Sequence, residues 1–435
     1  MNDKPSLDLE FVRSQFPGLE QGWTFFDNAG GSQILQGAID RINSFLIERN
    51  VQIGGSYEVS QKAAEALYEA RTAAMHLVNA TRPEEIVFGN STTALLQNLA
   101  RAMESQLEPG DEIIVTVSDH ESNIGPWDRL KSAGVIIKFW PLNKNTLSLD
   151  LADLQPLMSK RTRLVSVTHV SNILGSINPV RQIADFVHAQ GARLCVDAVA
   201  YAPHRLVDVQ AFDADYYVFS LYKTYGPHYA LMYGKYDYLL ELDTLYHYFY
   251  GKDKVPGKLE PGNPNYELAY STCGIVDYLT KLGEHAGEKG SVRNRIATAF
   301  KAITAQEDAL TERLLSYLRS RNDCQIVGQS HNGDSSRVPT IAFRFDGRDA
   351  AEICRAMDEH HIAMRFGDFH SRRLAEYLGL TDHGGMLRVS MVHYNTLEEV
   401  DRFTQALDKI LSGETGFAKA SWEKDGVDAL RYNHP

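Results

Sequence analysis

The feature that most constrains the fold is an alternation of short apolar runs with helical stretches between residues 85 and 221. The runs are rich in β-branched and aromatic residues, and they read EIVFGN, DEIIVTV, GVIIKFWPL, TRLVSVTHV, ARLCVDAV and DYYVFSL. Strands that are apolar along their whole length are typical of a mostly parallel sheet that helices cover on both faces. The sequence therefore predicts an α/β fold built around such a sheet.

Polar and ionisable side chains stand where these strands should end. His120, Asn172, Asp197, Ser220 and Lys223 each end one of the apolar runs or follow it closely. In open parallel sheets, ligands bind in a crevice outside the carboxyl ends of the strands. Residues that are far apart in the chain can thus converge on one site.

The regions around the predicted sheet show helical periodicity. Residues 32–50 place apolar side chains on one face after the capping-type Ser32, and residues 60–80 form a second amphipathic pattern. After about residue 290, a long helix (roughly 292–320) leads to alternating strands and helices. The last helix should begin at a capping box formed by Thr396 and Glu399.

We therefore predict four segments. Residues 1–23 form an N-terminal segment that packs with the small domain, and 24–290 form the large domain around the predicted sheet. A smaller α+β domain covers 291–412, and a polar tail covers 413–435.

The charge balance and the cysteines exclude several classes of protein. Lys and Arg number 44 against 56 Asp and Glu, so the net charge of −12 disfavours binding to nucleic acid or to an anionic membrane. The four cysteines lack the CxxC spacing of zinc sites, and we predict neither a metal nor a disulfide framework. Because the N-terminus has no apolar signal-like run, we expect a cytoplasmic protein.

Lys223 has an unusual setting in VFSLYKTYGPH, between an apolar run and a Gly-Pro turn. A lysine in a loop is ordinarily a solvated surface residue. At a buried strand end, however, a desolvated amine can form a Schiff base with the aldehyde of pyridoxal phosphate. That cofactor also needs an acid at its ring nitrogen, a cradle for its phosphate and a flat group to stack on.

The sequence offers candidates for the ring nitrogen and the phosphate. Asp197 ends an apolar run and can keep the ring nitrogen protonated, although a helix-capping role would explain it as well. The predicted phosphate cradle consists of hydroxyl groups and free N–H groups at the start of a helix, and an ordinary N-cap is the simpler alternative. Its residues are Ser91, Thr92 and Thr93, with a further hydroxyl from Ser220.

Two more residues can contact the faces and edges of the ring. His120 can stack on the ring, although a lone histidine is more often structural. Asn172 can bond the phenolic oxygen, and an Asx turn before Gly175 is the plainer explanation. Each signal is weak alone, and their joint order carries the prediction.

That order resembles the class V aminotransferase family, and within it the cysteine desulfurase-like branch. The resemblance runs from about residue 24 to 411 through FFDNAGG, GNSTTALLQNLA, SDHESNIGPW, THVSNILGSINPV, VDAVAYAPH, FSLYKTYGPH, EPGNPNYE and RVSMVHYNTLEEVD. It implies the fold type I architecture with a mostly parallel seven-stranded sheet and a small α+β domain. It also implies a pyridoxal 5'-phosphate cofactor, a small amino-acid substrate and a homodimer with shared active sites.

The resemblance assigns roles residue by residue. It implies that Lys223, Asp197 and His120 are catalytic. The implied cofactor-binding residues are Ser91, Thr92, Thr93, His120, Asn172, Asp197, Ser220, Tyr222, Lys223 and Asn263. The implied substrate-binding residues are Asn28, Ala29, Gly30, Tyr57, Arg365, His370 and Arg388, with Arg388 gripping the α-carboxylate through its planar fork.

The chain departs from the desulfurase pattern at several positions. Desulfurases carry a mobile cysteine that becomes a persulfide, and His370 stands about where that cysteine would be. Tyr222 replaces a histidine before the lysine, Ala200 a glutamine, and Asn263 a threonine of the interface loop. Residues 50–59 lack the basic residue that many desulfurases have, and Tyr57 is the candidate that faces the substrate there.

These observations predict an enzyme that forms a Lys223-bound aldimine and an α-carbanion on a small amino acid. Cysteine desulfurase-like C–S lyase chemistry without a persulfide cysteine is the leading prediction. An epimerase, a transaminase and a ring-forming enzyme that makes a C–C bond stay open as alternatives. From another class, a non-catalytic protein that binds the cofactor for regulation also stays open.

Overall fold

The central element is a seven-stranded sheet in a computed structural model that describes residues 7–245 and 247–414. Its strand order is β2-β8-β7-β6-β5-β3-β4, and the pairs from β7 to β4 are all parallel, whereas β8 runs antiparallel to both neighbours. The strands are β2 (Ile86–Gly89), β3 (Glu112–Thr116), β4 (Ile136–Trp140), β5 (Thr162–Thr168), β6 (Arg193–Asp197), β7 (Tyr216–Ser220) and β8 (Ala230–Gly234). This confirms the predicted fold class.

Both faces of the sheet are buried, as the continuous apolar runs predict. Along β7, Tyr217 and Phe219 join one hydrophobic cluster, and Tyr216 and Val218 join another on the opposite face. The first cluster contains apolar residues of α2 (Gln36–Glu48), α3 (Glu58–Val78), α7 (Val180–Ala189) and α10 (Tyr266–His285). The second contains those of α4 (Thr92–Met103). Because helices cover both faces of the sheet, the side chains on both sides of each strand are buried.

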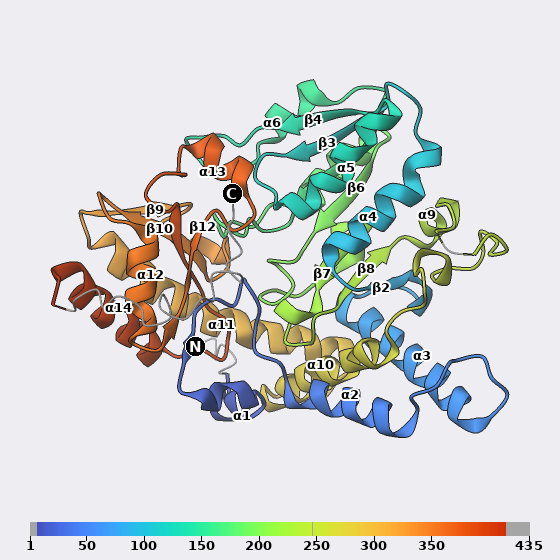
Figure 1. Cartoon of the computed structure of the whole chain (residues 1–435), viewed down its shortest axis with the longest axis horizontal. Helices are drawn as coiled ribbons and strands as arrows, with labels where there is room; N and C mark the ends of the chain where they lie inside the picture. Colours follow the sequence, from blue (N-terminus) through green and yellow to red (C-terminus); the bar gives the residue numbers. More distant parts are fainter. Residues whose placement is uncertain (1–6, 246, 415–435) are drawn as a thin grey trace, which may run out of the picture.

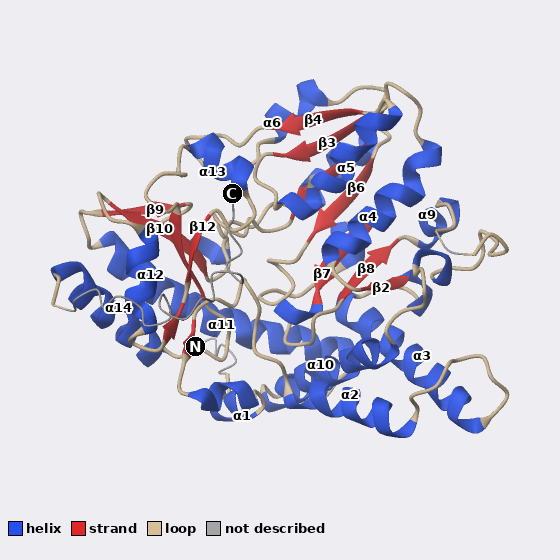
Figure 2. Ribbon diagram, viewed as in Figure 1, coloured by secondary structure: helices blue, strands red, loops and turns tan. Residues whose placement is uncertain are grey.

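A second sheet lies beside the first, with the order β12-β13-β10-β9, and all its pairs are antiparallel. Its strands are β9 (Cys324–Val327), β10 (Thr340–Phe345), β12 (Arg365–Gly367) and β13 (Met386–Ser390). They pack with α12 (Ala350–Asp358) and α14 (Leu397–Ser412) around a core of their own. Figures 1 and 2 show these elements, with α13 (Arg372–Leu378), grouped on one side of the seven-stranded sheet.

Three features connect the two sheets. The helix α11 (Val292–Arg319) contacts α3 and α10 along one part and α14 and β9 along another. The strand β1 (Thr24–Phe25) pairs in parallel with β11 (Ile362–Ala363). Helix α1 (Leu9–Ser14) precedes β1, and Arg13 of α1 donates to the Tyr394 carbonyl oxygen at 2.7 Å.

The remaining helices are short. They are α5 (Gly125–Asp128), α6 (Leu151–Leu154), α8 (Val209–Phe212) and α9 (Tyr236–Glu241). Among residues 7–245 and 247–414, every helix is too short or too polar to span a lipid bilayer.

The expected helices form, with one correction. The capping box of Thr396 and Glu399 is present at the start of α14. The expectation that a helix begins at Ser32 is wrong, because α2 begins at Gln36. The Ser32 hydroxyl instead accepts a hydrogen bond from the Tyr225 N–H at 3.0 Å. Ser32 therefore fixes its own segment against the turn that carries Lys223.

Candidate active site

The strand ends of the seven-stranded sheet form a crevice. Its inner part is lined by Ser91, Thr92, Thr93, His120, Ser122, Thr168, Val170, Asn172, Asp197, Val199, Ala200, Ser220, Tyr222 and Lys223. An adjoining cavity of about 340 Å³ is lined by Ala29, Gly30, Thr93, His120, Asn172, Tyr222, Lys223, Arg365, Phe369, His370 and Arg388. Because the two share Lys223 and four other residues, they form one continuous site.

Lys223 ends the short helical turn Leu221–Lys223 that follows β7. Lys223 is half-buried and lines both parts of the crevice. Partial burial of its amine, together with the charge of Arg388, lowers the pKa of Lys223 to about 8. Asp197 opposes the shift because a nearby carboxylate favours the ammonium form. Roughly one amine in ten is thus neutral at pH 7 and able to attack a carbonyl group.

Asp197 is the last residue of β6 and is buried. Burial raises the pKa of its carboxyl to about 6, against the hydrogen bond from the Val199 N–H and the charge of Lys223. That N–H reaches Oδ1 at 2.9 Å. A buried carboxylate of this kind gains most from a cationic partner, such as a protonated ring nitrogen.

Hydroxyl groups gather at the N-terminus of α4. Ser91 caps the helix, and its Oγ accepts from the Ala94 N–H at 3.1 Å. The Thr92 and Ser220 hydroxyls lie 2.8 Å apart across the crevice floor. Helix N–H groups and hydroxyls in this arrangement suit a phosphate dianion.

His120 is neutral, and its Nδ1 contacts Ser122. Its Nδ1 accepts from the Ser122 N–H at 3.1 Å, so that nitrogen carries no proton. Burial and the charge of Lys223 lower the pKa of His120 to about 3. A neutral imidazole can stack on a cationic aromatic ring without charge repulsion.

The predicted substrate clamp contains a carboxylate that the sequence analysis did not single out. Asp27 accepts from Arg388 Nη2 at 3.1 Å and from Arg365 Nε at 2.9 Å, so it bridges the two guanidinium groups. Arg388 is almost fully buried, and its Nε has no hydrogen-bond partner among the described residues. The motif FFDNAGG contains Asp27. Its pairing with Arg365 and Arg388, which lie more than 300 residues away in sequence, is visible only in the structure.

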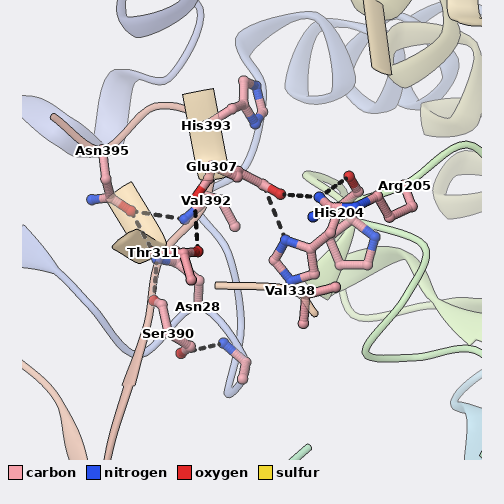
Figure 3. Close-up of polar contacts among 12 residues, drawn as sticks. Asn28, His204, Arg205, Glu307, Thr311, Val338, Ser390, Val392, His393 and Asn395 are labelled. Carbon is pink, nitrogen blue, oxygen red and sulfur yellow. Dashed lines mark hydrogen bonds and ion pairs between the residues drawn. The ribbon is translucent and has the colours of Figure 1, made fainter. Parts of the chain in front are cut away.

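Asn28 lies behind the crevice, whereas its neighbours Ala29 and Gly30 line it. The Asn28 side chain is buried and donates to the carbonyl oxygens of Phe25 and Ser390, both at 2.8 Å. Its Oδ1 accepts from the Tyr394 hydroxyl. Figure 3 shows it beside Ser390 and Asn395, so its amide ties the segment before Ala29 and Gly30 to the end of β13 and to Asn395.

Two predicted residues lie away from the crevice of their own chain. Tyr57 is 52% exposed at the N-cap of α3, and Asn263 lies in the turn after β8 and α9 with a φ of 66°. Neither lines the two parts of the site. The four cysteines are also absent from that lining. Cys195, Cys273 and Cys354 are buried, and Cys324 lies in β9.

A larger cavity, about 540 Å³, lies between α11 and the segment that contains Tyr201 and Leu206. Its Arg205 and Asp308 are paired with each other at 3.2 Å. The strand-end crevice holds Lys223 and the buried Asp197, so we place the active site there.

The side chains that line this crevice fit pyridoxal phosphate. They supply an amine, an acid for the ring nitrogen, hydroxyl groups for the phosphate and a neutral imidazole.

Comparisons with known proteins agree with this fit. The family model described as Aminotransferase class-V matches residues 24–403. The aminotransferase-like protein FGM3 of Gibberella zeae is 42% identical, over 93% of this chain and 99% of that protein. The cysteine desulfurase-like protein ustD of Aspergillus flavus is 33% identical, over 94% and 92% of the two chains. The apo structure of a cysteine desulfurase from Thermococcus onnurineus NA1 superposes with a TM-score of 0.82 at 25% identity, covering 94% of this chain and 98% of that one.

Proposed function

The chain belongs to the class-V aminotransferase family and is a pyridoxal-phosphate-dependent enzyme, and from this premise we propose that it acts on a small α-amino acid. The leading reaction is a cysteine desulfurase-like C–S cleavage that uses no persulfide cysteine. The observation that carries the proposal is the convergence of Lys223, Asp197 and Arg388 on one crevice.

The bound cofactor supplies an aldehyde carbon and an electron-withdrawing ring that makes the α-proton of an amino acid acidic. Lys223 holds the cofactor and then removes that proton, for which a pKa near 8 is well suited. Asp197 keeps a positive charge at the ring nitrogen. Arg388 orients the substrate through its α-carboxylate.

His370 is the proposed acid near the leaving group. It lines the substrate part of the crevice, and its ring centroid lies 5.4 Å from that of His120. Since none of the four cysteines, all within the described residues, lines the crevice, a sulfur leaving group would depart directly as sulfide. An epimerase, a transaminase and a C–C bond-forming enzyme share the first steps and differ in the fate of the α-carbon. A non-catalytic cofactor-binding protein would have no use for the Arg388 clamp.

We further propose a cytoplasmic homodimer with shared active sites. Tyr57 and Asn263 lie outside the crevice of their own chain, and a second copy can bring them to it. Large apolar side chains that would be costly to leave in water are also exposed on this chain, among them Tyr68 at 61% and Tyr248 at 99%.

The first experiment identifies the cofactor bond. The purified protein, incubated with pyridoxal phosphate, should show a visible absorbance band that borohydride removes, and mass spectrometry should locate the reduced label on Lys223. Lys223→Ala should lack the band, and the exposed Lys301→Ala should keep it. A label on another lysine would overturn the proposal.

The second experiment identifies the reaction. Amino acids that shift the band are assayed for sulfide, pyruvate, keto acid and exchange of the α-hydrogen for deuterium. If sulfide forms, alanine at Cys195, Cys273, Cys324 and Cys354 should each leave its rate unchanged. Loss of sulfide release in any one of these variants would contradict direct departure.

A further inference from the structure

The segment 367–371 has an unusual backbone. It begins at the last residue of β12 and occupies the place at which the desulfurase pattern has its mobile cysteine. Phe369 and His370 have φ values of 54° and 59°, a left-handed conformation that bulky residues rarely adopt. Residues in this conformation carry backbone strain and persist only where their surroundings hold them.

Hydrogen bonds from two other strand-end loops hold this segment. Asn172 Nδ2 donates to the Phe369 carbonyl oxygen at 2.9 Å, and the Ser371 hydroxyl donates to Asn172 Oδ1 at 2.8 Å. The Glu121 N–H donates to the His370 carbonyl oxygen at 2.9 Å. The Asn172 side chain therefore uses its Oδ1 and one of its two N–H groups here, and the other N–H is left for the predicted bond to the cofactor.

The segment 367–371 places the Phe369 ring against Arg388, the predicted carboxylate-binding residue. The Arg388 guanidinium carbon lies 4.2 Å from the centroid of the Phe369 ring. Both side chains are buried, with exposures of 3% and 7%. A cation stacked on an aromatic ring away from water is stabilised and is fixed in its plane.

We propose that residues 367–371 form a fixed wall of the substrate site, in which Phe369 positions Arg388 to receive a carboxylate. This inference deepens the proposed function, because it rests on Arg388 as the carboxylate-binding residue. The Phe369 ring covers one face of the Arg388 guanidinium, so a ligand can bind only along the edge that carries the N–H groups. Arg388 Nη2 donates to Asp27 at 3.1 Å, and Nη1 donates to the backbone carbonyl oxygen of Asn172 at 3.3 Å. Its Nε has no hydrogen-bond partner in the described structure.

The first test removes the aromatic face. Phe369→Leu keeps an apolar side chain but lacks the ring, and Phe369→Tyr keeps the ring. Phe366→Leu is the matched control, since Phe366 lies in β12, is 37% exposed and does not line the crevice. The readouts are the apparent Kd of an amino acid that shifts the cofactor band, and KM and kcat separately.

Phe369→Leu should weaken amino-acid binding about tenfold and raise KM with little change in kcat, in keeping with a cation–π contact in a dry site. Phe369→Tyr and Phe366→Leu should bind as the wild type does. Unchanged binding in Phe369→Leu overturns the positioning role. Absence of a Lys223-bound cofactor in the wild type overturns the proposed function instead.

The second test needs no cofactor. Hydrogen–deuterium exchange of a peptide covering 367–371 should be slow in the wild type and clearly faster in Ser371→Ala, which loses one of the hydrogen bonds to Asn172. Exchange in the wild type as fast as that of an unstructured peptide means a mobile arm and overturns the fixed wall.

Discussion

The reactivity of Lys223 depends on how little water surrounds its amine. With a pKa of about 8, roughly one amine in ten is neutral at pH 7, and the neutral fraction increases as pH rises through 8. The rate at which cofactor-free protein takes up pyridoxal phosphate should therefore rise with pH with a midpoint near 8. Stopped-flow absorbance measures this rate.

Asp197→Asn provides the matched comparison. The Asp197 carboxylate stabilises the ammonium form of Lys223, so its removal should move the midpoint to lower pH. A midpoint near 10.5 in the wild type, the ordinary value for lysine, would mean that the amine is solvated.

At the residue scale, the sequence predicts which side chains meet but not how each is used. Asp197, Ser220 and Lys223 are predictable because parallel strands must end at one edge of the sheet. Asn28 and Asn172 are different, because an amide can bind a ligand or a neighbouring backbone with equal ease. In the structure, Asn28 donates to the Ser390 carbonyl oxygen and Asn172 to the Phe369 carbonyl oxygen. Because these partners lie far away in sequence, the use of each amide could not be predicted.

At the element scale, α11 carries a buried carboxylate that joins it to the segment after β6. Glu307 accepts from Arg205 Nη1 and pairs with His204 Nδ1, each at 3.0 Å, as Figure 3 shows. Glu307→Ala would leave Arg205 with a buried charge that, among the described residues, Asp308 alone pairs with. Breaking a buried pair costs roughly 3–5 kcal/mol, which urea unfolding and a fall in Tm would reveal.

Glu312→Ala is the control in the same helix. Glu312 is half exposed and pairs with Arg319 at the surface, where an ion pair contributes about 0–1 kcal/mol. Equal losses in the two variants would contradict a special role for Glu307.

The ends of the helices show what local sequence can predict. The start of α14 is predictable because both members of its capping box lie within four residues. The start of α2 is not, since the Ser32 hydroxyl is used by the N–H of Tyr225, a partner 193 residues away. A helix cap whose hydrogen bonds join neighbouring residues can be predicted from the sequence, whereas a hydroxyl group that bonds a distant residue cannot.

At the scale of the whole molecule, the predicted division at residues 23, 290 and 412 stays a prediction. Arg13 of α1 bonds Glu399 of α14, as packing with the small domain requires, but Phe11 also stacks on His285 of α10. Residues 415–435 of the predicted tail lie outside the described part of the chain.

A shared active site makes a prediction that only two chains together can test. Suppose that Asn263 serves the crevice of the other copy. Asn263→Asp would then place a carboxylate beside the phosphate of its partner's cofactor and prevent its binding, while Lys223→Ala disables its own site. In a mixed dimer, the site with an intact Lys223 receives its Asn263 from the Lys223→Ala chain and is complete.

Co-expression of the two variants should therefore restore cofactor absorbance and activity to about a quarter of the wild-type level, because half of the dimers are mixed and each holds one complete site. Sedimentation velocity checks that dimers form, and each variant expressed alone serves as the control. Recovery would show that the sites are built across the interface. If Asn263→Asp alone is inactive and mixed dimers form without recovery, each chain completes its own site and Asn263 acts within its own chain.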